Sequence, residues 1–460
     1  MNTTIKIRGG KPLSGVINIA PNKNAILPAL LASILTDEAM TYKNVPESPD
    51  VKKILAALKE MGAAVAVNKN TVVICCKKIS THIVPSEHIR EMQAGYLFAG
   101  PLLARFGKAA IPPSSGCQLG YRGYEDHAEY FKKLGIATSI TEIGTQTYVL
   151  FQRATPIKEE RIVSHGKNQL YENRKVSYNN PLVTPTENIL MFSAGKSCFD
   201  TELSGIAQEP HVAQLIDLLR AMGVEIKGKG STLKIRNCMK LKGATFIPEP
   251  DHVDYFGFAV TAAMTKSDLF LQLPVTESIL HLSEFIVSMG IKLEVTDTGI
   301  TVLGSQSLYK LSATFPRAND AQTFKMNPGP WPMFPVDCLP SFVAWSTMNR
   351  DPNTSTISNN WMYDNGIQYV APMQLMGGRI LSFDNQRVTT AGIADRHPYR
   401  SSNLEVTAPK VIEGVRALIS CALSSAEHSE YTIHNADYIL RRNPNFFEVL
   451  KRLGADITVL

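Results

Sequence analysis

The feature that most constrains this chain is a unit that recurs six times: a helix with one apolar face, a Leu-Gly or Met-Gly pair, and a strand of alternating residues. In the first copy Val51, Ile54 and Leu58 fall on one helical face, and Ser48 with Pro49 forms a good helix start. Glycine has no Cβ, so it can end each helix in the left-handed conformation. The six pairs are Met61-Gly62, Leu134-Gly135, Met222-Gly223, Met289-Gly290, Met376-Gly377 and Leu453-Gly454.

The spacing of these units predicts the domain organisation. Six units in 460 residues average about 77 residues each, which is too long for a simple solenoid. Because three units can share one hydrophobic core, the repeats predict an α/β protein with two similar domains of roughly 220 residues. We expect helices inside, sheets outside and a ligand cleft between the domains. A generic α/β protein whose glycines recur by chance is the alternative.

The composition is that of a globular protein. Hydrophobic residues make up 44% of the chain and charged residues 19%, which excludes a disordered or collagen-like chain. No run approaches the roughly 18 apolar residues of a membrane span, and the first residues lack the apolar core of a signal peptide. We therefore expect a soluble, cytoplasmic protein.

Net charge and cysteine content exclude several classes of ligand and site. The net charge of +6 is too small and scattered to indicate nucleic-acid binding, but it suits an anionic small molecule. The seven cysteines include no CxxC pair, which argues against a disulfide framework or a structural zinc site. The signatures GxGxxG after a strand, GxxxxGKS/T, HExxH and GxSxG are also absent.

The first candidate segment is a short polar turn before an apolar run. Lys23 and Asn24 directly precede residues 26–31, which read as the start of a hydrophobic helix. A lysine and an asparagine in this position can hold an anion near the helix N-terminus. A solvated turn without a ligand is the alternative.

The second candidate segment is a loop rich in Pro, Ser and Gly at residues 111–124. Cys117 lies at its middle between Gly116 and Gly120, and Arg122 follows. Free cysteines are usually buried, and a nearby guanidinium lowers the pKa of a thiol and raises its reactivity. The segment predicts a reactive cysteine, with a surface thiol of no function as the alternative.

The third candidate segment, residues 330–340, contains four prolines among aromatic side chains and presents one carboxylate, Asp337. A rigidly held carboxylate beside apolar groups can act as a general base. The alternative is that Asp337 only caps a helix beginning near Ser341.

Taken together, these segments resemble the UDP-N-acetylglucosamine enolpyruvyl transferases (1-carboxyvinyltransferases), which are relatives of EPSP synthase. The resemblance runs from Ile5 to Val459. Its most specific motifs are KNAILPALLAS, GPLLARFG, the Cys117 loop with Arg122, TENILM at residues 186–191, PDHVD at residues 250–254 and FPVD at residues 334–337.

The resemblance implies a fold and a reaction. The fold is a two-domain inside-out α/β barrel with three helix-strand units per domain; one domain covers residues 22–246, the other residues 1–21 plus 247–460, and the active site lies between them. The reaction moves the enolpyruvyl group of phosphoenolpyruvate to the 3-hydroxyl of UDP-N-acetylglucosamine for peptidoglycan synthesis and releases phosphate. The family includes the target of fosfomycin and needs no metal or organic cofactor. We expect a monomer or weak homo-oligomer with no nucleic-acid or membrane partner.

The resemblance also implies roles for individual residues. Cys117 is the general acid and can form an adduct with the substrate, Asp337 takes the proton of the acceptor hydroxyl, and Lys23 is the third catalytic residue. Lys23, Arg122 and Arg441 hold the anionic groups of phosphoenolpyruvate. The predicted substrate-binding residues are Asn24, Arg122, Arg441, Arg416 and Asp254.

The sequence departs from the family pattern where anion and acceptor contacts are expected. Gln93 replaces an arginine, with Arg90 one helical turn away, Leu97 replaces an aromatic residue, and Gly366 replaces a second arginine. A third expected arginine falls at Val415, beside Arg416. The stretch at residues 155–180 is polar and longer than its counterpart in the family.

Each missing cation weakens binding of an anionic ligand by about 1–3 kcal/mol. An enolpyruvyl transferase of specialised metabolism that uses another nucleotide, such as UMP, therefore stays open. A second alternative is an inactive relative that binds only a nucleotide-sugar or a protein partner.

Overall fold

The computed structural model describes eleven stretches of the chain. They are residues 3–90, 92–114, 123–153, 174–195, 200–236, 238, 240–307, 322–351, 354–362, 365–393 and 397–460. Cys117, Arg122 and most of the long polar stretch predicted at residues 155–180 lie outside these residues. No helix in the described part is long and apolar enough to cross a membrane.

The chain divides into two compact units. The first unit contains the described residues from Asn22 to Pro248, and the second contains those up to Pro21 and from Glu249 to Leu460. Each unit has its own hydrophobic core, drawn from residues 25–246 in the first and from residues 5–17 and 253–457 in the second.

In the first unit the described strands form three sheets, with the orders β13-β3-β5-β4, β11-β12-β10-β9 and β6-β8-β7. The strands are β3 (Met40–Tyr42), β4 (Ala64–Asn68), β5 (Thr71–Cys75), β6 (Lys108–Ile111), β7 (Ile136–Ile143), β8 (Gln146–Arg153), β9 (Arg174–Ser177), β10 (Thr201–Ser204), β11 (Ile226–Lys229), β12 (Thr232–Ile235) and β13 (Thr245–Phe246). The helices are α1 (Lys23–Ala32), η1 (Ser33–Leu35), α2 (Pro49–Glu60), α3 (Ser86–Ile89), η2 (Gln93–Phe98), α4 (Ala99–Phe106), α5 (Glu125–Lys133), α6 (Val183–Ala194) and α7 (Pro210–Ala221).

In the second unit the described strands also form three sheets, with the orders β21-β22-β1-β23, β15-β16-β14-β2 and β17-β18-β20-β19. The strands are β1 (Ile5–Arg8), β2 (Gly15–Asn18), β14 (Asp268–Gln272), β15 (Leu293–Thr296), β16 (Gly299–Leu303), β17 (Gln322–Met326), β18 (Thr354–Asn359), β19 (Ile380–Ser382), β20 (Arg387–Ala391), β21 (Leu404–Thr407), β22 (Glu430–His434) and β23 (Asp456–Val459). The helices are α8 (His252–Met264), α9 (Glu277–Ser288), η4 (Gly304–Gln306), η5 (Val336–Cys338), α10 (Leu339–Ser346), α11 (Val370–Met376), α12 (Ile412–Leu423), η6 (Ala436–Arg441) and α13 (Phe446–Arg452).

The sheets share one pairing pattern. Each four-stranded sheet has a parallel pair at one edge followed by two antiparallel pairs, as in β9-β10, β10-β12 and β12-β11. The three-stranded sheet has the two antiparallel pairs, and an isolated parallel bridge between Ile83 and Ala110 of β6 takes the place of the edge strand. Each sheet contains the strand that follows one of the six repeat glycines, so the sheets correspond to the units of the sequence repeat.

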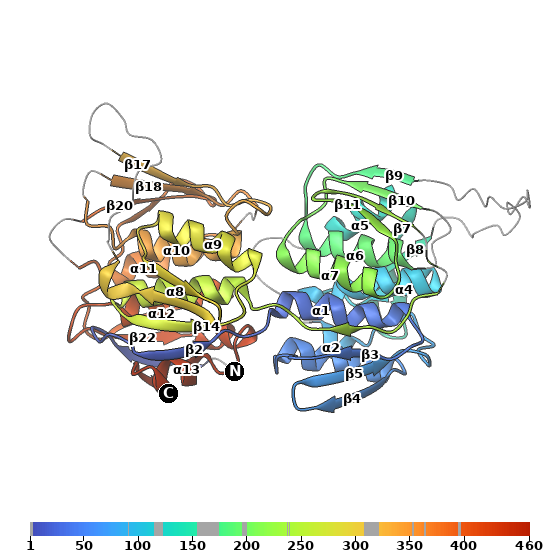
Figure 1. The fold of residues 1–460 in the computed structure, drawn as a ribbon, viewed down its shortest axis with the longest axis horizontal. Coiled ribbons are helices and arrows are strands. Elements are labelled where there is room, and N and C mark those ends of the chain that lie inside the picture. The colour runs from blue at the N-terminus through green and yellow to red at the C-terminus, as the bar shows by residue number, and fades with distance from the viewer. Residues whose placement is uncertain are drawn as a thin grey trace, which may run out of the picture. The chain divides into compact units, whose positions relative to one another are not determined.

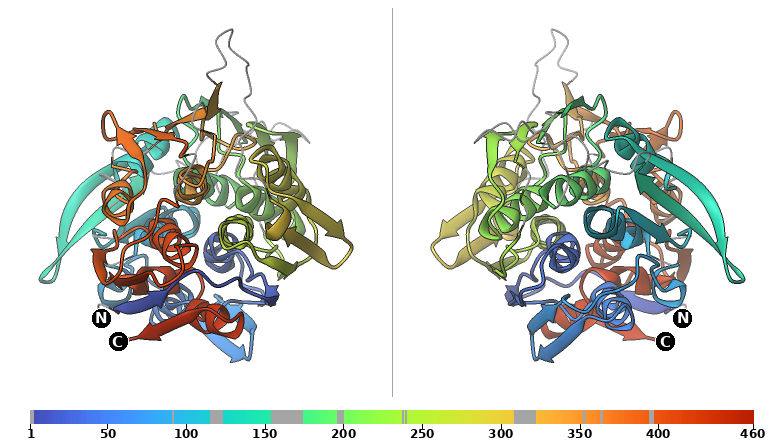
Figure 2. Two further views of the ribbon diagram at one scale, coloured as in Figure 1. Left: turned by 90° about the vertical axis from the view of Figure 1, so that its left-hand side faces the viewer. Right: turned by 90° about the vertical axis from the view of Figure 1, so that its right-hand side faces the viewer.

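Helices fill the interior of each unit and sheets lie outside them (Figures 1 and 2). All residues of α8 are buried, and nearly all of α1 and α12 are buried. These helices are apolar around most of their circumference, which is the pattern of a helix packed on every side. The predicted α/β class, with helices inside and sheets outside, is confirmed.

The six glycines that end the repeat helices all have positive φ, between 77° and 114°. The predicted start of α2 is also confirmed, because Ser48 Oγ accepts a hydrogen bond from the Val51 N–H at 3.2 Å and Pro49 is the first helical residue. In the fifth unit Pro372 lies within α11, which has only seven residues. The alternating pattern predicts strands at Val224–Lys227 and Ile291–Val295. In the structure these strands begin two residues later, at Ile226 and Leu293.

Candidate functional site

Lys23 and Asn24 begin helix α1 in the first unit. Asn22 is the N-cap, and its Oδ1 accepts a hydrogen bond from the Asn24 N–H at 2.9 Å. Lys23 is 7% exposed, and its Nζ donates to Oδ2 of Asp50 in the first turn of α2 at 2.9 Å. The alternative of a solvated turn is therefore wrong for Lys23.

The buried ammonium group of Lys23 has more hydrogen-bond donors than its ion pair with Asp50 uses. Lysine offers three N–H donors, and the bond from Lys23 to Asp50 uses one of them. The N-terminus of α1 adds a partial positive charge beside it. Anion binding at this turn stays a prediction.

Asp337 lies in η5, a single turn between Pro335 and helix α10 of the second unit. The loop before it is anchored by Phe334, which is buried and packs edge-on against Phe256 and Phe285 with ring centroids 5.3 Å apart in each case. The N-cap of α10 is Cys338, and no side chain caps the helix. The alternative that Asp337 only caps this helix is therefore wrong.

The Asp337 carboxylate is 35% exposed, and its Oδ2 lies 3.3 Å from Nη2 of Arg442. Arg442 belongs to a buried group that we call the ionic cluster: Asp251, Asp254, Glu413, Arg416 and Arg442. Arg442 Nη1 contacts both carboxylate oxygens of Asp251, at 2.9 and 2.8 Å, and Arg442 Nε lies 2.7 Å from Oε1 of Glu413. Asp337 is thus a partly exposed carboxylate at the edge of a buried ion network.

The other half of the ionic cluster surrounds Arg416. Its Nη2 donates to Oδ1 of Asp254, and its Nε donates to Oε2 of Glu413 at 2.8 Å. The guanidinium carbon lies 4.9 Å from the ring centroids of both Phe258 and Phe446. Glu413 therefore bridges the two arginines.

The ionic cluster has three carboxyl groups for two guanidinium groups. Burial raises the pKa of both Glu413 and Asp254, although the arginines partly offset this effect. Burial also opposes ionisation of Asp251, but the charge of Arg442, His252 and a backbone N–H hold the pKa of Asp251 below its usual value. Carboxylates raise the pKa of Arg442 further above its usual value.

Two residues predicted to bind substrate do not have the exposure that this role requires. The side chains of Arg416 and Asp254 are both 0% exposed and are paired with each other. Their burial does not agree with direct substrate contacts, because each would have to leave its partner inside the core. Their ion pair joins α8 and α12.

Arg441 and Arg442 follow each other at the end of η6, but their environments differ. Arg441 is only partly buried, whereas Arg442 is buried in the ionic cluster. The sequence predicted a substrate contact for Arg441 but no role for Arg442, Asp251 or Glu413. A signal was available for one of them, because Glu413 and Arg416 have the i, i+3 spacing of a helical ion pair.

The structure describes three of the positions that depart from the family pattern. Leu97 is 2% exposed and packs in the first core, and Gln93 begins η2. At Gly366, an added Cβ would lie 2.0 Å from Nδ2 of Asn360, which is itself buried. An arginine at residue 366 would therefore require Asn360 to move.

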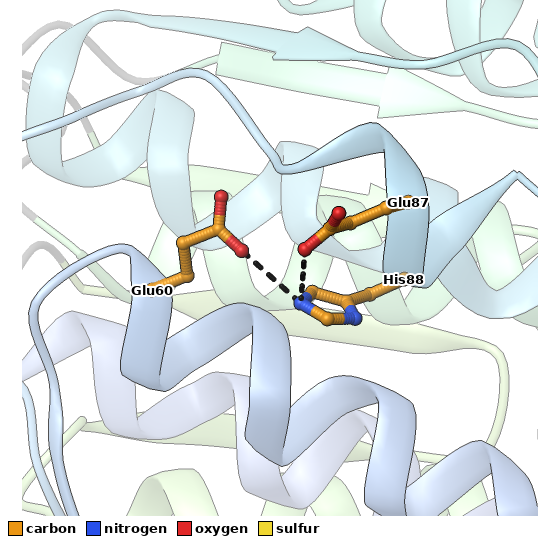
Figure 3. Close-up of side chains that lie close together, drawn as sticks. All are labelled: Glu60, Glu87 and His88. Carbon is orange, nitrogen blue, oxygen red and sulfur yellow. Dashed lines mark hydrogen bonds and ion pairs between the residues drawn. The ribbon is translucent and has the colours of Figure 1, made fainter.

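A separate group of metal-ligand side chains occurs in the first unit. Figure 3 shows Glu60 at the end of α2 beside Glu87 and His88 of α3. His88 Nε2 lies 3.1 Å from Oε2 of Glu60 and 3.3 Å from Oε1 of Glu87. Because both contacts meet at one nitrogen and both glutamates are exposed, imidazole-carboxylate pairing is enough to explain the group.

Comparison with known proteins gives one consistent family. The sequence profile of EPSP synthase (3-phosphoshikimate 1-carboxyvinyltransferase) matches residues 7–450. Among curated proteins, the chain is 30% identical over 456 residues to a UDP-N-acetylglucosamine 1-carboxyvinyltransferase of Desulforapulum autotrophicum, covering 98% of both chains. It is 28% identical over 456 residues to the protein of that name from Treponema denticola, again covering 98% of both chains.

Solved structures show the same fold. The enolpyruvyl transferase NikO from Streptomyces tendae matches with a TM-score of 0.79 and 16% identity, covering 100% of this chain and 99% of that one. An EPSP synthase from Acinetobacter baumannii matches with a TM-score of 0.70 and 16% identity, covering 100% of both chains.

Proposed function

Because the chain belongs to the EPSP synthase family, we propose that this enolpyruvyl transferase moves the enolpyruvyl group of phosphoenolpyruvate to the 3-hydroxyl of UDP-N-acetylglucosamine and releases phosphate. The observation that carries the proposal is the Asp337 carboxylate, which is partly exposed at the start of α10 and held by Arg442. The product would be a precursor of peptidoglycan.

The proposed chemistry begins with addition. The acceptor hydroxyl oxygen attacks C2 of phosphoenolpyruvate while Asp337 takes the hydroxyl proton and Cys117 donates a proton to the methylene carbon. The resulting tetrahedral adduct carries the phosphate on C2. Loss of that phosphate together with a proton from the new methyl group restores the double bond, so the acceptor leaves as its enolpyruvyl ether.

Binding of the donor requires fixed cations, because phosphoenolpyruvate carries a phosphate and a carboxylate. Lys23 is suited to this role, since it is buried, lies 2.9 Å from Asp50 and is placed at a helix N-terminus. We assign Arg441 and Arg122 to the same task, and Asn24 to the acceptor. The burial of Arg416 and Asp254 supports a structural role for them in this scheme.

Another nucleotide, such as UMP, is the second candidate acceptor. Gln93 and Gly366 favour it, because each lacks a cation that the family pattern places there, and a side chain at residue 366 would require Asn360 to move. A relative that binds a nucleotide-sugar without turnover is the third candidate. The presence of both predicted proton-transfer residues, Cys117 and Asp337, argues against it.

Phosphate release separates these candidates. The full chain is incubated with phosphoenolpyruvate and, in parallel, with UDP-N-acetylglucosamine, UMP or no acceptor. Release with UDP-N-acetylglucosamine supports the first proposal, and release only with UMP supports the second. If no nucleotide gives release above the reaction without acceptor, the proposed function is wrong.

A further inference from the structure

The ionic cluster contains one residue that links the buried charges to the proposed active site. Arg442 contacts three carboxylates from three parts of the second unit: Asp251 at the N-cap of α8, Glu413 in α12 and Asp337 in η5. Of these, Asp251 and Glu413 are buried, and Asp337 is 35% exposed. Arg442 is therefore the bridge between a fixed interior and a partly exposed carboxylate.

The contact between Arg442 and Asp251 is held in place by the backbone of α8. Oδ1 of Asp251 also accepts hydrogen bonds from the N–H groups of Val253 and Asp254, at 3.0 and 3.1 Å. Asp251 is thus fixed by the first turn of α8, and it holds Arg442 Nη1 through both carboxylate oxygens. Nη2 is the guanidinium atom that faces Asp337. Because the guanidinium is planar, the double contact of Nη1 with Asp251 limits the directions that Nη2 can take.

We propose that Arg442 is a positioning residue for Asp337, and that it fixes the direction in which this carboxylate faces the acceptor hydroxyl. The inference deepens the proposed function and rests on it, since Asp337 matters for chemistry only if proton transfer occurs there. Arg442 itself is 95% covered and is assigned no contact with substrate. Its effect is on orientation, because a misplaced base can lower a rate by up to about a hundredfold.

The cluster offers a matched pair of variants for the test. Arg442→Gln alone leaves Asp251 buried without its arginine partner, and such a change can prevent folding. The test variant therefore combines Arg442→Gln with Asp251→Asn, which keeps the net charge of the chain and removes the contact with Asp337. The control combines Arg416→Gln with Asp254→Asn, which removes the neighbouring buried pair but leaves the contact between Arg442 and Asp337 in place.

The first readout does not depend on turnover. A water-soluble carbodiimide with an amine couples to accessible carboxyl groups, and peptide mass spectrometry gives the labelling rate at Asp337. We expect several-fold faster labelling of Asp337 in the Arg442→Gln, Asp251→Asn variant and an unchanged rate in the control. Equal rates in both variants, or no change in either, would overturn the inference.

The second readout is steady-state kinetics with phosphoenolpyruvate and the active acceptor. We expect kcat of the test variant to fall tenfold to a hundredfold with little change in KM for phosphoenolpyruvate. A fall in kcat no larger than that of the control would contradict positioning. If Asp337 labelling changes as expected but the unmodified chain releases no phosphate with any acceptor, the proposed function fails while the placement of Asp337 by Arg442 stands.

Discussion

The ammonium group of Lys23 lies 2.9 Å from Oδ2 of Asp50, and the two side chains are only 8% and 5% exposed. Both residues lie in first turns, Lys23 in α1 and Asp50 in α2, so two helices are joined at their N-termini. A buried ion pair is costly to break from one side, because the partner left behind keeps its charge without compensation.

Lys23→Met is expected to lower the free energy of unfolding by about 3–5 kcal/mol, because the buried Asp50 carboxylate loses its 2.9 Å ion pair with Lys23. Adding Asp50→Asn should restore most of this stability but not turnover, since the donor still lacks a cation. Urea denaturation and phosphate release measure the two effects. Lys6→Met is the control, because its pair with Glu430 is more exposed and is worth at most about 1 kcal/mol. An unchanged stability of Lys23→Met would show that the pair is not formed in solution.

Asp337→Asn is expected to lower kcat by a factor of about 100 to 10,000, the usual contribution of general acid-base catalysis. Its stability should change little, because Asp337 is partly exposed and loses a single 3.3 Å ion pair. Kinetics with saturating substrates and thermal melting check the two statements. Asp384→Asn removes another surface carboxylate with an arginine partner and should retain kcat. Full activity of Asp337→Asn would show that Asp337 is not the general base.

Cys117→Ser is expected to lower turnover strongly without unfolding the chain, since serine is far less acidic than cysteine as a proton donor. We also expect fosfomycin to alkylate Cys117 when substrate is present. The buried thiols provide an internal control: burial raises the pKa of Cys76 to about 11 and that of Cys421 to about 12, so they remain protonated and unreactive. Peptide mass spectrometry identifies the modified residue, and an adduct elsewhere or none at all would contradict the prediction.

His127 should make stability depend on pH. Burial lowers the pKa of His127 from 6.5 to about 3, and its Nδ1 accepts a hydrogen bond from Asn188 at 2.8 Å. Between these two pH values the unfolded chain binds a proton that the folded chain does not, so folding stability falls as the pH falls below about 6.5. At pH 5.5 the loss is about 1.4 kcal/mol from this residue.

His127→Gln is expected to remove that part of the pH dependence while keeping a polar group beside Asn188. Urea denaturation of both chains at pH 7.5 and pH 5.5 isolates the effect, because other titrating groups contribute equally to each chain and cancel in the difference. The stability of the variant should therefore drop less on acidification. An identical drop in both chains would mean that His127 is not held neutral.

The sequence predicted the repeating architecture because each repeat is defined by residues that lie close together in the chain. The glycines at 62 and 454 end helices whose apolar spacing is visible within a dozen residues, and Ser48 caps α2 three residues away from its partner. Local chemistry also indicated Lys23 and Asp337 as unusual residues. Strand starts were less accurate after Gly223 and Gly290, because alternation alone does not show where pairing begins.

The ionic cluster could not be predicted, because its contacts are distant in sequence. Arg442 lies 191 residues from Asp251 and 105 residues from Asp337. In sequence, Arg441 and Arg442 are equivalent neighbours, and only tertiary packing decides that Arg442 is buried. The same packing makes Arg416 a core residue, although its charge alone suggested a ligand for an anion.

The measurement that tests the central claim most directly is the mass of the acceptor after reaction with phosphoenolpyruvate labelled with ¹³C at all three carbons. We predict that UDP-N-acetylglucosamine gains one enolpyruvyl group carrying all three labelled carbons while inorganic phosphate appears in equal amount. If the same product forms on UMP, the assigned acceptor is wrong but the assigned reaction is correct. If every nucleotide tested is recovered with its mass unchanged while phosphoenolpyruvate stays intact, the account of this chain as an enolpyruvyl transferase acting on a nucleotide hydroxyl is contradicted.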